Sequence, residues 1–265
     1  MLMPILGSDI EKRRKDILKV AGKDLELGFL YAEFNFEWIV RRMILCFSRC
    51  PIVVIKAALR KASGYNDYER LWKLFVCSFD SSIPSIEKLL NNGDQNISEN
   101  LKLYIVRRHV LVHGVKGGIG DATAICGIST FLKAAERLVG FAKDNKIELF
   151  KRLKPRSNRH CVFERRDGIE KLKNECNTNT CSTSLIEQCP VLNIKETAKA
   201  IRKHLREKSL PVAELSGLNQ EDIIRKVQSV AEELGIADKT SVKKAIDKLI
   251  KSPRNRNNSL SSRSH

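Results

Sequence analysis

Two arginines and two histidines occur in RRHVLVHG, residues 107–114, within an otherwise aliphatic stretch. Burying so many polar groups is costly unless they find partners. An imidazole can move a proton at an attacking 2′-hydroxyl or at a departing oxygen. A guanidinium can hold a phosphate and offset the charge that develops in the transition state. Arg108 and His113 are therefore a candidate site for cutting RNA without a metal, with Arg107 and His109 in supporting positions.

The spacing of Arg108 and His113 sets a condition on this site. Five steps of about 100° place them about 140° apart on a helix, so they do not share one face. Gly114 follows directly and is predicted to end the helix, which lets the last turn reorient toward a common cleft. The helix C-terminus should also favour a protonated His113. Because one histidine cannot be base and acid in the same step, we expect a two-fold dimer to supply the second.

The segment resembles the R-x4-6-H signature of the HEPN superfamily, in which a polar residue often follows the arginine. Here Arg108 is followed by His109, three aliphatic residues and His113. The resemblance covers about residues 25–150 and implies a helical bundle whose motif ends a late helix. It also implies a homodimeric, metal-independent endoribonuclease with Arg108 and His113 catalytic and His109 supporting.

The same resemblance implies a toxin or antiviral effector, with an antitoxin or another regulatory protein as a candidate partner. One antitoxin-paired subtype carries a tyrosine two residues past the histidine. Position 115 is a valine in this chain. Regulation by modification of such a tyrosine is therefore not expected.

Other interpretations of the segment remain open. His109 and His113 are four residues apart, a spacing that can chelate a metal. Because the chain has no HExxH and no obvious third ligand nearby, we predict neither a metal nor a cofactor. The four polar residues could also be a solvated helix end. The chain would then be a non-enzymatic nucleic-acid-binding regulator that dimerises through its bundle, or a scaffold for protein contacts.

The charge balance indicates the kind of partner. The chain has 48 Lys+Arg against 31 Asp+Glu, a net charge of +17, which favours polyanions such as nucleic acid or an anionic membrane surface. No segment approaches the roughly 18 to 20 uninterrupted apolar residues that span a bilayer. The N-terminal apolar residues precede the basic ones, the reverse of a secretory signal. We expect a cytoplasmic, RNA-binding protein that does not enter the membrane and keeps its cysteines mostly reduced.

Hydrophobic periodicity predicts an all-α fold. Residues 24–50 are dense in apolar residues with recurring charges, as in a largely buried helix. Another long helix is expected to start at about Asp121, after a glycine-rich loop. Up to residue 152 the pattern predicts four or five helices with short connections, which is typical of an antiparallel helical bundle.

Three further parts follow the bundle of residues 1–152. Residues 153–192 are basic and then rich in Asn, Thr, Ser and Cys, which predicts a polar linker with one short helix near Ile169–Asn174. Residues 193–252 predict a small domain of three helices, and residues 253–265 a disordered basic tail.

The last two helices of the small domain resemble a helix-turn-helix, with Gly235 in the turn. In that arrangement three lysines would contact nucleic acid: Lys239, Lys243 and Lys244. The alternative is an ordinary helical domain for protein contacts.

Overall fold

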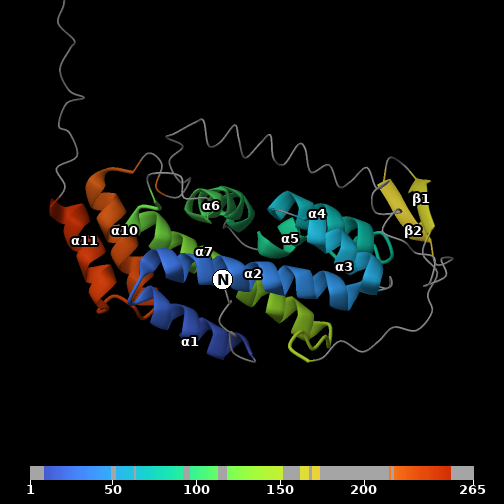
Figure 1. The fold of residues 1–265 in the computed structure, drawn as a ribbon, viewed down its shortest axis with the longest axis horizontal. Coiled ribbons are helices and arrows are strands. Elements are labelled where there is room, and N and C mark those ends of the chain that lie inside the picture. The colour runs from blue at the N-terminus through green and yellow to red at the C-terminus, as the bar shows by residue number, and fades with distance from the viewer. Residues whose placement is uncertain are drawn as a thin grey trace, which may run out of the picture.

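The computed structural model describes residues 9–48, 52–62, 64–91, 96–112, 118–151, 162–166, 169–173, 215 and 218–251. Two long helices, α2 (Leu25–Phe47) and α7 (Asp121–Asp144), lie side by side and form the centre of the molecule (Figure 1). The protein is mostly helical, as the periodicity predicts. No helix in the described part of the chain is long and apolar enough to cross a membrane.

The other N-terminal helices surround this central pair. They are α1 (Ile10–Ala21), α3 (Ile52–Lys61), α4 (Tyr65–Trp72) with its π-helical continuation η1 (Lys73–Cys77), α5 (Ile86–Leu90) and α6 (Ile97–Val112). The described residues up to 151 thus contain more helices than the four or five expected. The additional ones are short or, like α1, amphipathic with few apolar residues.

The start of α2 matches the sequence expectation closely. The side chain of Asp24 caps the helix by accepting a hydrogen bond of 2.9 Å from the backbone N–H of Leu27. Beyond this cap, apolar side chains face α7. Phe29 and Phe36 contact Phe131 of α7 with ring centroids 5.4 and 5.8 Å apart, and all three rings are buried. The Phe29–Phe131 pair is edge-to-face, a geometry that adds to the stability that burial provides.

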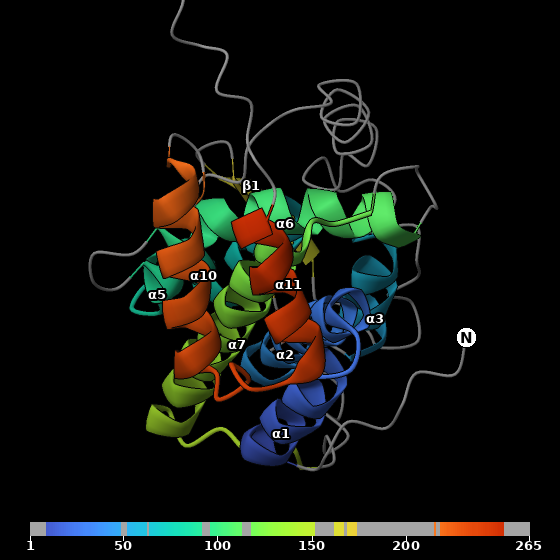
Figure 2. The ribbon, with the colours of Figure 1, turned by 90° about the vertical axis from the view of Figure 1, so that its left-hand side faces the viewer.

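Helix α6 lies across α2 and α7 rather than running alongside them. It is seen end-on in Figure 1 and runs across the view in Figure 2. A Cβ atom on Gly127 of α7 would overlap the ring of Phe29 and would lie 3.0 Å from Cδ1 of Tyr104 on α6. The missing side chain thus lets three helices approach closely at one point. This crossing departs from the antiparallel arrangement expected for the whole bundle.

Helix α1 packs on α2 through an unusual buried arginine. The guanidinium of Arg13 stacks 3.8 Å from the ring centroid of Trp38, and its Nη1 donates a 3.3 Å hydrogen bond to Asn35. Only 8% of Arg13 is exposed. Burial is also the main cause that lowers the pKa of its guanidinium. The arginine therefore joins α1 to the aromatic side of α2.

The C-terminal helices α10 (Gln220–Glu233) and α11 (Thr240–Lys251) pack against α7. Asn219 caps α10 by accepting a 2.8 Å hydrogen bond from the N–H of Asp222, and Gly235 adopts φ +67° in the turn. Val227, Ala231 and Val242 are completely buried in the same hydrophobic cluster as the bundle core. The first of the three helices expected in residues 193–252 lies outside the described residues.

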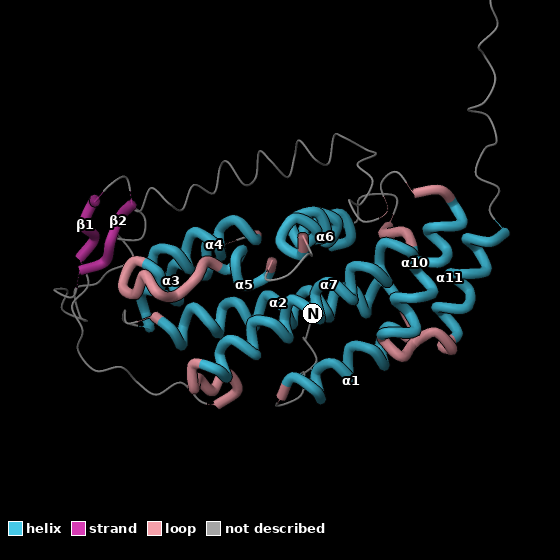
Figure 3. Tube along the Cα trace, turned by 180° about the vertical axis from the view of Figure 1, so that it is seen from behind, coloured by secondary structure: helices cyan, strands magenta, loops and turns pink. Residues whose placement is uncertain are grey.

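A two-stranded antiparallel hairpin occupies part of the expected linker. Strands β1 (Val162–Arg166) and β2 (Ile169–Lys173) lie at the end of the molecule opposite α10 and α11 (Figure 3). The short helix predicted near Ile169–Asn174 was therefore wrong. In the register of this hairpin Phe163 lies opposite Leu172 and Arg165 opposite Glu170, a pairing between two segments that a helical period does not reveal.

Candidate site: a charged cluster between α2 and α6

Arg108 points from α6 toward two glutamates of α2. Its Nε atom lies 3.4 Å from Oε2 of Glu33, and an Nη atom lies 3.8 Å from Oε2 of Glu37. The guanidinium carbon lies 5.3 Å from the ring centroid of Phe34, a cation–π distance. The side chain keeps 19% of its surface exposed. The arginine predicted from the sequence thus has defined acidic neighbours and remains partly accessible.

Glu37 is the centre of a second set of contacts. Its Oε1 accepts hydrogen bonds of 2.9 and 2.6 Å from Nε and Nη2 of Arg41, one turn further along α2. The hydroxyl of Tyr68 on α4 also donates to this oxygen, and Arg41 Nε lies 3.0 Å from the same hydroxyl. Glu37 is therefore fixed by charge-assisted bonds from two helices.

The ionisation of this cluster is unusual. Burial raises the pKa of Glu33 to about 8, and the neighbouring Glu37 adds to the shift, while Arg108 and Arg41 oppose it. Burial and the nearby Glu37 also raise the pKa of Tyr68. Burial alone would lower the pKa of Arg41, but Tyr68 and Glu37 outweigh it and raise that pKa. At neutral pH the Glu33 carboxyl is thus mainly protonated.

Glu33 and Arg108 also carry polar atoms that lack hydrogen-bond partners. Oε2 of Glu33 and Nε of Arg108 are both buried, and neither makes a hydrogen bond, although only 3.4 Å separates them. Buried polar groups are nearly always paired in folded proteins. Such a pair of unsatisfied groups is a feature of functional sites as well as of strained ones.

The other residues of the motif are described only in part. Helix α6 ends at Val112, which is 48% exposed, and His113 lies outside the described residues. The backbone of His109 belongs to α6, but its side chain is not described. Arg107 is half-buried beside Arg108. The structure therefore locates the arginine of the candidate pair and the helix end that precedes the histidine.

The chain is anchored again shortly after the motif. The backbone N–H of Ile119 donates a 3.0 Å hydrogen bond to Glu26 of α2, and Gly118 adopts φ +51°. Asp121, the first residue of α7, pairs with Lys248 of α11 at 3.1 Å. Ile119, the second described residue after α6, is therefore tied to the first turn of α2.

The lysines of the predicted helix-turn-helix lie elsewhere. Lys239 and Lys244 are exposed, and Lys243 lies 3.5 Å from Asp238. The first turn of α11 rests on the end of α1, because the Ser241 hydroxyl donates a 2.8 Å hydrogen bond to the carbonyl of Ala21. These lysines border the α1 contact at the end of the molecule, whereas Arg108 faces α2.

Sequence reasoning missed the acidic half of the cluster. Glu33, Glu37 and Arg41 recur every four residues along α2, so they form one charged row on a largely apolar helix. That spacing was visible in the sequence. What it could not reveal was that Arg108 and Tyr68, from two other helices, meet this row.

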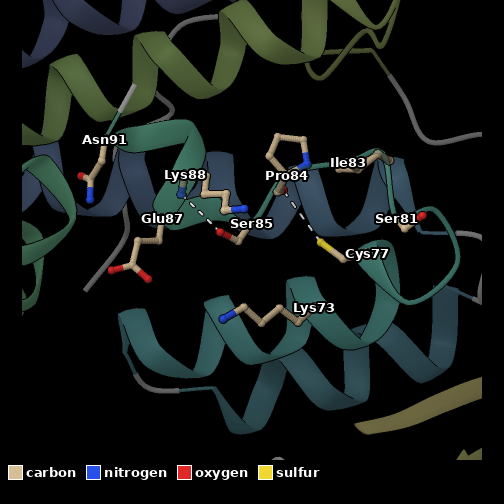
Figure 4. Close-up of a pocket in the computed structure, with 9 residues that line it drawn as sticks. All are labelled: Lys73, Cys77, Ser81, Ile83, Pro84, Ser85, Glu87, Lys88 and Asn91. Carbon is tan, nitrogen blue, oxygen red and sulfur yellow. Dashed lines mark hydrogen bonds between the residues drawn. The ribbon is translucent and has the colours of Figure 1, made fainter. Parts of the chain in front are cut away.

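A groove of about 810 Å³ lies between η1 and the loop before α5 (Figure 4). Lys73 and Lys88 line it, but Lys73 pairs with Glu69 at 3.1 Å. Burial raises the pKa of the Cys77 thiol to about 11, so it is not a nucleophilic thiolate at neutral pH. The groove contains none of the residues predicted to act on RNA.

Within the described part of the chain, no group of three or more His, Cys, Asp or Glu side chains is arranged to hold a metal ion. The fold and site together define an all-α protein with a buried, partly protonated charged cluster. Comparisons with family models, with curated proteins and with solved structures find no match to the chain.

Proposed function

We propose that this chain is a metal-independent endoribonuclease of the HEPN type that acts as a homodimer in the cytoplasm. The observation that carries the proposal is the position of the Arg108 guanidinium and its positive charge. Its guanidinium lies near the end of α6 beside Glu33, a carboxyl whose pKa is raised to about 8. The positive charge is therefore not cancelled by Glu33 at neutral pH, and it can attract a phosphate.

In the proposed reaction the 2′-hydroxyl of RNA attacks the adjacent phosphorus. The new 2′-O–P bond forms as the P–O5′ bond breaks, which leaves a cyclic phosphate and a free 5′-hydroxyl. Arg108 stabilises the charge on the phosphoryl oxygens. His113 accepts the proton from the 2′-hydroxyl, and His113 of the second protomer gives a proton to the departing oxygen. His109 and Arg107 have supporting positions.

RNA incubation in the presence of EDTA tests this activity. We expect the wild type to cut RNA and to leave cyclic-phosphate ends, and His113→Ala to reduce cutting by about 10²- to 10⁴-fold, the usual contribution of general acid–base catalysis. Arg108→Gln should also lose activity. Arg60→Gln removes the same charge at an exposed position on α3 and is the matched control. Failure of the dimeric wild type on several RNAs would overturn the proposal.

A non-enzymatic nucleic-acid-binding regulator is the second candidate. The approach of Arg108 to Glu33 and Glu37 favours it, because an arginine so placed can also serve only to join α6 to α2. This candidate predicts salt-dependent RNA binding that survives His113→Ala without any cleavage.

The net charge of +17 supports RNA as the partner of either candidate. The exposed Lys239, Lys243 and Lys244 are candidate contacts to its backbone. Each lysine that contacts a phosphate adds somewhat less than one unit to the slope of log binding constant against log salt concentration. Replacing all three by glutamine should therefore reduce this slope by up to about three such contributions. An unchanged slope would show that these lysines of the α11 region do not contact RNA.

A role as a toxin or antiviral effector is part of the same proposal, with an antitoxin or another regulatory protein as a candidate partner. Growth arrest on expression, relieved by His113→Ala, would support it. Normal growth of cells that contain the active ribonuclease would argue against it.

A further inference from the structure

The Arg108 guanidinium has one edge turned inward. Its Nε atom is buried and faces Oε2 of Glu33, whose side chain is only 4% exposed. The ring of Phe34 lies beside the guanidinium at 5.3 Å. Glu33 and Phe34 thus limit how the guanidinium can turn, and the exposed 19% of the side chain lies outside its buried Nε edge.

Glu37 cannot take the place of Glu33 in this arrangement. It already accepts two hydrogen bonds from Arg41 and one from Tyr68, all at Oε1. Its other oxygen approaches Arg108 only to 3.8 Å. Arg41 and Glu37 therefore form a closed pair, and Arg108, which makes no hydrogen bond with Glu37 and is partly exposed, can take another acceptor.

A count of charges indicates what that acceptor is. Glu37 supplies one negative charge, while Arg41 and Arg108 supply one positive charge each. Since Glu33 is mainly protonated at neutral pH, the cluster has a surplus of one positive charge. A surplus positive charge on a partly exposed guanidinium attracts anions, so the site favours a single anion at the exposed edge of Arg108.

We propose that Glu33 is a positioning residue that aims Arg108 at one phosphodiester anion, and that ionisation of Glu33 turns this anion site off. The inference rests on the proposed function and names the chemistry that regulates it. When Glu33 loses its proton, its carboxylate pairs with Arg108 and competes with the phosphate. From α6 the charged group that faces Glu33 is Arg108; from α2 these are Glu37 and Arg41; from α4, Tyr68 acts through Glu37.

Binding of a short 2′-O-methyl oligonucleotide tests the inference without cleavage, because this RNA has no 2′-hydroxyl to attack. Fluorescence anisotropy between pH 7 and pH 9 covers the ionisation of Glu33 and avoids that of ordinary histidines. We expect wild-type affinity to fall up to about tenfold over this range if the two anions exclude one another. Glu33→Gln, which mimics the protonated carboxyl, should bind as the wild type does at pH 7 and lose the pH step.

Three further variants separate positioning from folding. Glu33→Ala should weaken binding at pH 7 because Arg108 is no longer aimed, whereas Glu33→Gln should restore it. Arg108→Gln should remove both the affinity and the pH step, and Arg60→Gln should retain both. If Glu33→Ala does not fold, as judged by circular dichroism, the comparison of Glu33→Gln with wild type still decides.

The outcomes distinguish this inference from the proposed function. A Glu33-dependent pH step in binding without any cleavage of ordinary RNA supports the inference and rejects the ribonuclease. Cleavage together with the same pH step in wild type and Glu33→Gln overturns the inference and leaves the ribonuclease standing. Equal binding by wild type and Arg108→Gln also overturns the inference.

Discussion

Glu33 of α2 and Arg108 of α6 face each other with 3.4 Å between Oε2 and Nε, and neither atom makes a hydrogen bond. The carboxyl is almost completely buried, and its pKa is raised to about 8. An ion pair that is incomplete at neutral pH contributes little stability but leaves a positive charge available. The contact therefore links the packing of two helices to the electrostatics of the candidate site.

The pH dependence of stability should report the burial of Glu33. Its folded pKa lies above the unfolded value of 4.5, so between the two the folded chain keeps a proton that the unfolded chain has released. The free energy of unfolding should then fall as pH rises from about 4.5 to about 8, by up to about 1.4 kcal/mol per pH unit from this group alone. It should not fall further above that range. Glu33→Gln should remove this contribution.

Urea denaturation at pH 5, 6.5 and 8 measures this effect. The advantage of Glu33→Gln over wild type should increase with pH. Glu148→Gln is the control, because the Glu148 side chain is 63% exposed. Equal pH slopes for wild type and Glu33→Gln would contradict a buried, protonated Glu33.

Glu37→Gln should destabilise the protein. The substitution removes the charged acceptor of two hydrogen bonds from Arg41 and one from Tyr68. We expect a loss of about 1–3 kcal/mol in the free energy of unfolding, measured in urea. Glu136→Gln breaks a more exposed pair with Arg14 and should cost no more than about 1 kcal/mol. A smaller loss for Glu37→Gln than for Glu136→Gln would show that the cluster does not join the helices.

Gly127→Ala should disturb the crossing of α2, α6 and α7. Its Cβ would overlap the Phe29 ring and crowd Tyr104. Overpacking of this kind typically costs about 1–3 kcal/mol. Gly140 lies on the same helix with nothing within 4 Å of its Cβ position, so Gly140→Ala should be neutral or stabilising by up to about 1 kcal/mol. Thermal melts of the two variants compare them directly, and equal shifts would argue against close packing at Gly127.

Val227→Ala should weaken the whole helical assembly. Val227 of α10 is completely buried in the cluster that includes the bundle core. Loss of its methyl groups should cost about 2 kcal/mol. Because α10 and α11 pack on α7, we expect one cooperative unfolding transition that moves to lower urea concentration. Two separate transitions, with only one of them shifted, would show that α10 and α11 unfold independently.

Local patterns in the sequence predicted the long helices well. The apolar run of residues 24–50 corresponds to α2, and Gly235 lies in the turn after α10 as expected. These features depend on neighbouring residues only. The pattern missed α1, whose buried face is short and includes Arg13, and it placed a helix where β2 lies.

The sequence alone determined that the chain is helical, that it is strongly basic and that Arg108 stands near the end of a helix rich in aliphatic residues. Only the tertiary structure decided what Arg108 contacts. Helix periodicity reports which side of a helix is apolar, but not which other helix covers it or at what angle it crosses. Because α6 crosses α2 where Glu33 lies buried, the arginine acquires a carboxyl neighbour whose charge is suppressed by burial. That suppression follows from the loss of water around Glu33, which is a property of the assembled fold.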